Sequence, residues 1–269
     1  MITFPPCKIN LGLNVIRKRH DGYHDIETCF YPVPWTDVLE ILPAGHLSFI
    51  ATGNAIEGSE NDNLCLRAFR LLQEEYSIPP VFIHLHKTIP MGAGLGGGSS
   101  DAAYTLRMLN AIFKLQLSTE VLRNLAARLG SDCAFFIDES PMIGKGRGEQ
   151  LTPCEISLKE KFLLIVKPDV SVSTAQAYAG VIPLEPEEAI LSILQQPLSV
   201  WKDKLENDFE ISVFNQFPVI GDIKKKMIAL GAAYASMSGS GSAVFGIFES
   251  PVGVPPEFRK LQHWSGMLK

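Results

Sequence analysis

The chain has 269 residues, of which 46% are hydrophobic, and its formal net charge at pH 7 is −5. This length is enough for one large domain or for two of ordinary size, each with a buried core. No broad basic patch indicates a nucleic-acid partner, and no apolar run reaches the roughly 20 residues that cross a bilayer. The five cysteines are widely spaced and form no C-x-x-C pair, which favours reduced thiols in a cytoplasmic protein.

The N-terminal segment predicts a hairpin. Cys7–Lys18 alternates between apolar and polar residues, with Lys8 and Asn10 on the polar face. Asp21-Gly22 is a turn signal, and a second strand is expected from about Tyr23 to Tyr31. Asp37–Leu42 looks like a third strand.

A glycine-rich loop follows the next predicted helix and strand. One of Asn61, Asp62 and Asn63 can cap a helix over Leu64–Tyr76, and Val81–Lys87 alternates like a strand. Then comes PMGAGLGGGSSDAA, in which five of the seven residues from Gly92 to Gly98 are glycine. The helical spacing of apolar residues resumes over Ser99–Phe113, with Ser99 or Ser100 as the predicted N-cap.

The order of strand, glycine loop and helix N-terminus predicts a phosphate site. Free amides point out of the helix end, and the helix dipole adds about half a positive charge there. A flexible linker or a tight turn is the alternative. The spacing fits the dinucleotide fingerprint, but the acidic residue expected about 20 residues on is missing. The Walker A lysine, the protein-kinase HRD and DFG signatures and the esterase elbow are also absent.

The rest of the chain predicts further helices and strands. Ser118 can cap a helix over Thr119–Leu129 that Gly130 ends, and Lys161–Lys167 reads as a buried strand. The segment Gly144–Gly148 is expected to be a loop near the weakest seam of the chain, which suggests two lobes. The remaining predicted helices are Ser173–Tyr178, Leu184–Pro197, Trp201–Gln216 and Pro218–Leu230.

Three polar spots leave alternatives open. The stretch SMSGSGS, Ser236–Ser242, lies between two apolar strands and is either a hairpin loop or a second phosphate-binding loop. Asp132 follows a helix stop and precedes an apolar run, so it is either a helix cap or a partly buried general base. Asn207-Asp208 is polar, and the sequence assigns it no role.

These pieces together resemble the GHMP kinases, the family of galactokinase, homoserine kinase and mevalonate kinase. The loop PMGAGLGGGSS resembles their phosphate motif, and SMSGSGSAVFGIF resembles their C-terminal glycine motif. The N-terminal PCKINLGLNVIRKRHDGYHDIET is similar to the members that act on a cytidine diphosphate sugar alcohol. The resemblance spans essentially the whole chain, with the three motifs in the family's order.

The resemblance implies an α+β fold of two lobes, with an N-terminal nucleotide-binding domain over residues 1–150 and a C-terminal domain over residues 151–269. It implies transfer of the γ-phosphoryl of ATP, with Mg²⁺, to the 2-hydroxyl of the methylerythritol unit of a cytidine diphosphate substrate. That reaction belongs to the non-mevalonate route to isoprenoid precursors. The partners would be small molecules, without nucleic acid or membrane, and the protein would be a monomer or a homodimer.

The family's functional residues carry over by position. Asp132 matches the catalytic aspartate and Lys8 the lysine beside it. The ATP-binding residues would be Pro90, Met91, Gly92, Ala93, Gly94, Leu95, Gly96, Gly97, Gly98, Ser99 and Ser100. The substrate-binding residues would be Asn10, Tyr23, His24, Phe30, Tyr178, Gly239 and Ser240, with the aromatic residues and His24 at the cytosine.

Two other functions stay open at this point. One is a GHMP kinase acting on mevalonate or homoserine. The other is a nucleotide-binding regulator that has lost catalysis, although the retention of Lys8 and Asp132 argues against it, since a binding protein needs neither.

Overall fold

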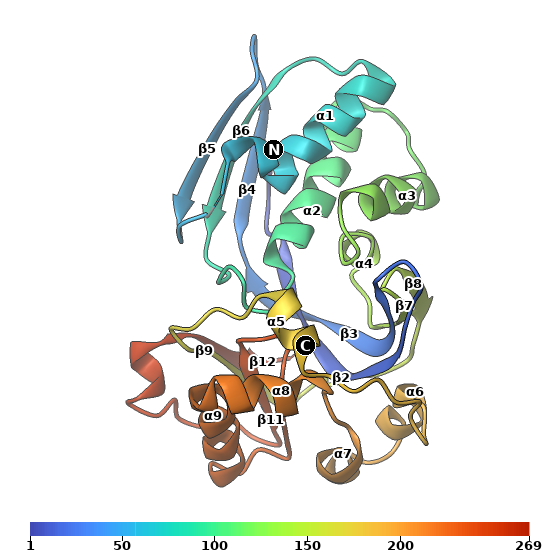
Figure 1. Cartoon of the computed structure of the whole chain (residues 1–269). Helices are drawn as coiled ribbons and strands as arrows, with labels where there is room; N and C mark the ends of the chain where they lie inside the picture. The colour runs from blue at the N-terminus through green and yellow to red at the C-terminus, as the bar shows by residue number, and fades with distance from the viewer. Residues whose placement is uncertain (57, 269) are drawn as a thin grey trace. The chain divides into compact units, whose positions relative to one another are not determined.

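The computed structural model describes residues 1–56 and 58–268, and their packing divides the chain into two units (Figure 1). The first unit comprises Met1–Lys8, Pro32–Met91 and Gly96–Ser140. The second unit comprises Ile9–Tyr31, Gly92–Leu95 and Pro141–Lys269. Both units mix helices and strands, so the α+β prediction is confirmed. The division of the chain at residues 150 and 151 stays a prediction.

The first unit is a sheet covered on one face by helices. The sheet has the strand order β1-β4-β6-β5, in which only the β5–β6 pair is parallel. Helix α2 packs against α1, α3, α4 and β4, and Figure 1 shows α1 and α2 along one side of the sheet. The strands are β1 (Ile2–Thr3), β4 (Val38–Pro43), β5 (Ser48–Gly53) and β6 (Val81–Lys87), and the helices are η1 (Glu60–Asp62), α1 (Leu64–Tyr76), α2 (Gly97–Ile112), α3 (Thr119–Leu129) and α4 (Phe135–Asp138).

Side-chain caps start two of these helices where the sequence predicts them. Asn63 Oδ1 accepts the amide of Cys65 at the start of α1, and Ser118 Oγ accepts the amide of Val121 at the start of α3.

Helix α2 begins differently. Its N-cap is Gly96, whose φ of 70° is left-handed, and no side chain caps the helix. The prediction that Ser99 or Ser100 is the N-cap is therefore wrong, and both serines lie in the first turn. The reason is that a glycine can turn the chain at Gly96 without steric cost, which starts the helix at Gly97.

The second unit holds two further antiparallel sheets. One has the order β10-β11-β9-β12 and packs through β10 and β11 against α9. The other has the order β2-β3-β7-β8, and its strands β2 and β3 begin or end in the first unit. The strands are β2 (Pro6–Lys18), β3 (His24–Thr36), β7 (Met142–Gly146), β8 (Gln150–Pro153), β9 (Phe162–Lys167), β10 (Tyr234–Met237), β11 (Val244–Phe248) and β12 (Gln262–Met267). The helices are α5 (Thr174–Ala179), α6 (Ile190–Leu194), α7 (Leu198–Lys204), α8 (Phe209–Gln216), α9 (Pro218–Ala229) and η2 (Phe258–Lys260).

Three predictions about the second unit are wrong. The expected loop Gly144–Gly148 falls largely in β7, because Gly144 pairs with Thr28 of β3 and leaves room for the Phe30 ring. The expected helix Leu184–Pro197 is reduced to α6, and the Leu184 amide bonds instead to the Val15 carbonyl. The expected helix Trp201–Gln216 is two helices, because residues 205–208 break it and pair with β2.

The cysteines are free thiols, as the sequence predicts. Cys29 Sγ lies 3.8 Å from Cys154 Sγ, and the other three side chains are buried. Within residues 1–56 and 58–268, no helix combines the length and the apolar character that a membrane span requires.

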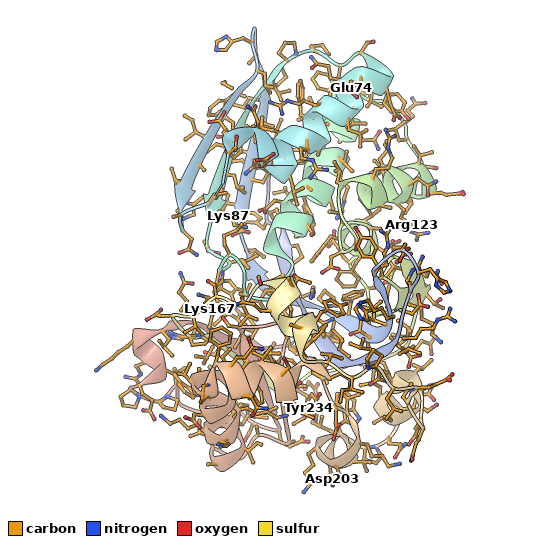
Figure 2. All side chains as sticks on the ribbon, in the orientation of Figure 1. Glu74, Lys87, Arg123, Lys167, Asp203 and Tyr234 are labelled. Atoms are coloured by element: carbon orange, nitrogen blue, oxygen red, sulfur yellow. The ribbon has the colours of Figure 1, made fainter. Side chains whose placement is uncertain are left out.

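A buried ion triad ties the first unit together. The Lys87 ammonium at the end of β6 donates to Asp101 Oδ2 of α2 at 2.7 Å and to the carboxylate of Asp37 before β4 (Figure 2 labels Lys87). Asp37 also accepts the backbone amides of Thr88 and Ile89. Burial opposes the charge on Lys87, but the two carboxylates outweigh it and raise its pKa.

We predict that Asp37→Ala destabilises the protein by about 3–5 kcal/mol, because it leaves a buried lysine with half of its partners and two amides with none. The measurement is the free energy of unfolding in urea. The matched control is Glu249→Ala, which removes the exposed partner of Lys161 and is expected to change stability by less than about 1 kcal/mol. Equal effects of the two substitutions would show that the triad does not hold the unit together.

Candidate active site

The N-terminal end of α2 lies between two buried lysines of the first unit. A Cβ atom built on Gly96 would lie 3.2 Å from Lys8 Cε, and one built on Gly97 would lie 3.2 Å from Lys87 Nζ. The first amides of α2 therefore emerge beside two ammonium groups, each of which is paired with at least one carboxylate. The free amides and the helix dipole favour an anion at this helix end.

Lys8 pairs with the predicted base. Its ammonium lies 3.6 Å from Asp132 Oδ2, and the two side chains are 4% and 33% exposed. Burial lowers the pKa of Lys8, and the Asp132 carboxylate acts in the opposite direction. Ser99 hydrogen-bonds the Cys133 side chain, which places the first turn of α2 beside the turn that carries Asp132. The arrangement offers an accessible carboxylate next to an ammonium and a helix end.

The same turn of α2 fits a nucleotide's phosphates and their metal ion. Ser100 Oγ and Asp101 Oδ1 are buried, and neither finds a hydrogen-bond partner in the part of the chain that the structure describes. No cluster of three or more metal-ligating side chains occurs among the described residues. Mg²⁺ typically binds through substrate phosphates, waters and one or two protein oxygens. A hydroxyl at a helix N-terminus suits that mode of binding.

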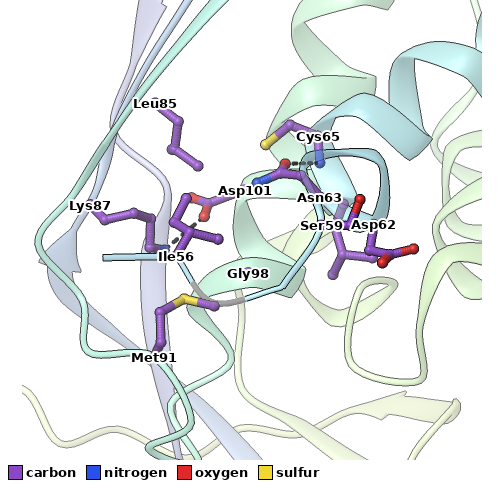
Figure 3. Close-up of a pocket in the computed structure, with 11 residues that line it drawn as sticks. Ile56, Ser59, Asp62, Asn63, Cys65, Leu85, Lys87, Met91, Gly98 and Asp101 are labelled. Atoms are coloured by element: carbon purple, nitrogen blue, oxygen red, sulfur yellow. Dashed lines mark hydrogen bonds and ion pairs between the residues drawn. The ribbon is translucent and has the colours of Figure 1, made fainter. Parts of the chain in front are cut away.

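A cavity of about 120 Å³ lies beside this helix end in the first unit (Figure 3). Its polar wall holds Lys87 and Asp101, which are joined by their ion pair, and Met91 and Gly98 connect it to the glycine loop. Sequence reasoning missed this cavity, because its wall comes from three separate parts of the chain. The lining residues are Ile56, Ser59, Asp62, Asn63, Leu64, Cys65, Leu85, Lys87, Met91, Gly98 and Asp101.

In the second unit, the two glycine-rich stretches touch each other. Gly94 has a φ of 73°, and a Cβ atom on it would lie 1.9 Å from the Ser238 carbonyl oxygen. Ser238 Oγ donates to the Gly94 carbonyl at 2.8 Å, and the Ala243 amide donates to the Ala93 carbonyl at 3.1 Å. The stretch Ser236–Ser242 therefore holds the first half of the glycine loop.

Asn10 lies against this second loop. Its side-chain amide donates to Thr28 Oγ1 at 2.9 Å, and its Oδ1 lies 3.4 Å from Ser238 Oγ, whose shorter bond is to the Gly94 carbonyl. A Cβ atom on Gly239 would lie 3.3 Å from Asn10 Oδ1. The structure thus brings together Asn10 and Gly239, two predicted substrate-binding residues, with half-buried Ser240 next along the loop.

The predicted cytosine-binding residues include a stack of rings. His24 and Tyr178 are parallel at 4.5 Å, and Tyr178 meets Phe209 edge-on at 4.7 Å. Tyr23 is 56% exposed, and the Arg147 guanidinium lies 4.9 Å from its ring centre. Burial, and then the charge of Lys18, lower the pKa of His24, which favours the neutral imidazole at pH 7. Phe30 is buried, with its ring against Gly144.

Comparison with known families decides the class of protein. Residues 63–139 match the model of the GHMP kinases N terminal domain, and residues 189–263 match the model described as GHMP kinases C terminal. The chain belongs to the GHMP kinases. This GHMP kinase is an ATP-dependent enzyme that acts on a small molecule. The first matched range contains the helix end and Asp132, whereas Lys8 and Asn10 precede both ranges.

Full-length relatives of this GHMP kinase carry a more specific name. A Cytophaga hutchinsonii protein named 4-diphosphocytidyl-2-C-methyl-D-erythritol kinase is 52% identical and covers 93% of each chain. A Parabacteroides distasonis protein of the same name is 47% identical over 100% of both chains. The crystal structure of a 4-(cytidine 5'-diphospho)-2C-methyl-D-erythritol kinase aligns with a TM-score of 0.83 at 33% identity, covering 99% of this chain and 98% of that one.

We predict that Gly94→Ala destabilises the protein by roughly 2–5 kcal/mol, because a methyl group meets the Ser238 carbonyl and the backbone is left-handed. The control is Gly92→Ala, which has a φ of 58° but no atom near its Cβ, and we expect about 1–2 kcal/mol there. Urea unfolding of both variants measures the difference. A Gly94 variant no less stable than the Gly92 variant would contradict the contact between the two loops.

Proposed function

We propose that this GHMP kinase phosphorylates the 2-hydroxyl of 4-diphosphocytidyl-2-C-methyl-D-erythritol in the non-mevalonate route to isoprenoid precursors. The observation that carries the proposal is the Lys8–Asp132 pair, at 3.6 Å, in the unit that contains the N-terminal end of α2. Such a pair supplies a base and a positive charge for phosphoryl transfer. The full-length relatives named for this substrate support its choice.

In the proposed reaction, the substrate hydroxyl oxygen forms a bond to the γ-phosphorus of ATP while the bond from that phosphorus to the β,γ-bridging oxygen breaks. Asp132 takes the proton of the hydroxyl, and ADP leaves. Lys8 offsets negative charge on the transferring group. Little other chemistry is required of the protein, since positioning and charge dominate this class of reaction.

ATP is proposed to bind along the glycine loop. The segment from Pro90 to Ser100 would contact the phosphates through the amides that begin at Met91 and through the end of α2, with Ser99 and Ser100 donating hydroxyls. Mg²⁺, when bound, supplies charge neutralisation between the phosphates. We propose that the adenine base of ATP binds in the cavity of Figure 3, because apolar walls and a few polar groups beside a phosphate site suit an aromatic heterocycle.

The substrate is proposed to bind residues of the second unit at its cytidine end. Tyr23, His24 and Tyr178 offer ring faces, and the neutral His24 imidazole offers one donor and one acceptor for the base edge. Phe30 would support this group from within the sheet. Asn10, Gly239 and Ser240 would hold the part of the substrate that carries phosphate.

We predict that the wild-type protein releases ADP from Mg-ATP with the cytidine substrate, and not with mevalonate or homoserine. Asp132→Asn is expected to lower kcat about 10²–10⁴-fold, because the base is lost while the shape is kept. The control is Asp203→Asn, at an exposed carboxylate of α7. Turnover only with mevalonate or homoserine would contradict the proposed cytidine substrate. Full activity of the Asp132 variant would contradict the role of Asp132 as the general base.

We also predict that Tyr23→Ala raises KM for the cytidine substrate about 5- to 100-fold, by analogy with the loss of one stacked base contact. Since the ring is proposed to contact only the base, kcat should stay within about 3-fold of wild type. Steady-state kinetics, with CDP as a competitor, measure both. Phe4→Ala removes a similarly exposed ring from the first unit and should change neither constant.

A further inference from the structure

Asn207 is a buried polar residue without a part in the reaction described above. Its side chain is inaccessible, since the residue is 3% exposed. Its amide nitrogen donates to the carbonyls of Met237 at 2.8 Å and Gly239 at 2.9 Å, and its Oδ1 accepts the amide of Phe209 at 3.0 Å. Both amide hydrogens are therefore used on the second glycine loop.

The neighbours of Asn207 hold strand β2. The Leu13 amide donates to the Glu206 carbonyl at 2.8 Å, and the Asp208 amide donates to the Leu13 carbonyl at 2.9 Å. Asp208 Oδ2 accepts the Val15 amide at 2.6 Å. We call residues 206–208 the clasp. It binds β2, which carries Asn10, on one side and the loop Ser238–Ser242 on the other.

The direction of one loop peptide follows from the clasp. In a trans peptide, the carbonyl of one residue and the amide of the next point in opposite directions. Because the Asn207 side chain donates a hydrogen bond to the Gly239 carbonyl, the Ser240 amide is directed away from Asn207. A backbone N–H group that is held in one direction can donate a hydrogen bond to an anionic ligand, even where no helix dipole contributes.

We propose that Asn207 is a positioning residue for substrate binding: by holding the Met237 and Gly239 carbonyls, it keeps the loop in the conformation that presents the Ser240 amide to the substrate's diphosphate. The proposal rests on the proposed function, which places Gly239 and Ser240 at the substrate. Asn207 itself does not touch the substrate. Its loss should therefore weaken substrate binding and leave the chemical step intact.

Asn207→Asp is the sharpest variant, because it keeps the shape and the acceptor for Phe209 but replaces the donor by an oxygen that faces two carbonyls. The matched control is Asn110→Asp. Asn110 of α2 likewise donates to a loop carbonyl, that of Leu117 at 3.3 Å, and accepts the Leu117 amide at 3.0 Å. Asn207→Ala is the second variant, for use if the buried carboxylate prevents folding.

We expect KM for the cytidine substrate to rise about 10-fold or more in the Asn207 variant, since two buried acceptors lose their donor, with kcat within about 3-fold of wild type. The Asn110 variant should keep the wild-type KM and kcat, even if its melting temperature falls as far as that of the Asn207 variant. An unchanged KM at Asn207, or an equal rise at Asn110, would overturn the proposal.

Hydrogen exchange separates failure of this proposal from failure of the proposed function. Without any substrate, the amides of Ser238–Ser242 should exchange at least about 10-fold faster in the Asn207 variant and unchanged in the Asn110 variant. If the wild type does not use the cytidine substrate, this readout still tests the hold on the loop. Unchanged exchange in the Asn207 variant would reject that hold, whatever the enzyme's substrate.

Discussion

The placement of the N-terminal end of α2 between Lys8 and Lys87 is the constraint on which the candidate active site depends. Side chains at Gly96 and Gly97 would collide with Phe136 or Ile89 and crowd the two lysines. The glycines therefore do more than bend the chain. They let a helix end, with its free amides, pack closely against the side chains of two lysines.

The two lysines differ in how their charge is balanced. Lys87 is paired with two carboxylates that are as buried as it is, so its charge is committed to holding α2, β6 and the start of β4 together. Lys8 has a partner in Asp132 that is one-third exposed, so this carboxylate is within reach of solvent. The pair of Lys87 is thus fully buried, whereas the pair of Lys8 is accessible from one side. The clasp at Asn207 holds the second glycine loop through buried hydrogen bonds, just as Lys87 holds the start of α2 through buried ion pairs.

Local signals in the sequence predicted local structure well. The Asn63 and Ser118 caps, the Asp21-Gly22 turn and the Gly/Ser hairpin loop are set by neighbouring residues, and all are confirmed. Apart from the N-cap of α2, which the nearby Gly96 decides, predictions failed where distant residues decide. Pairing with Leu13 interrupts the helix expected around Asn207, and pairing with β3 makes the expected loop at Gly144 a strand. The Asp37–Lys87–Asp101 triad joins three segments that no sequence window contains. The Lys8–Asp132 pair was reached only through the family resemblance.

The interleaving of the two units along the chain affects how the protein folds during synthesis. Strands β2 and β3 are made first, yet their next sheet neighbour, β7, begins only at Met142, after the first unit's last residue. The strand β9 receives its partner β12 from Gln262–Met267, about 95 residues later along the chain. On the ribosome, the early hairpin must therefore keep an unpaired edge until most of the polypeptide has emerged, a period in which strand edges are prone to aggregate.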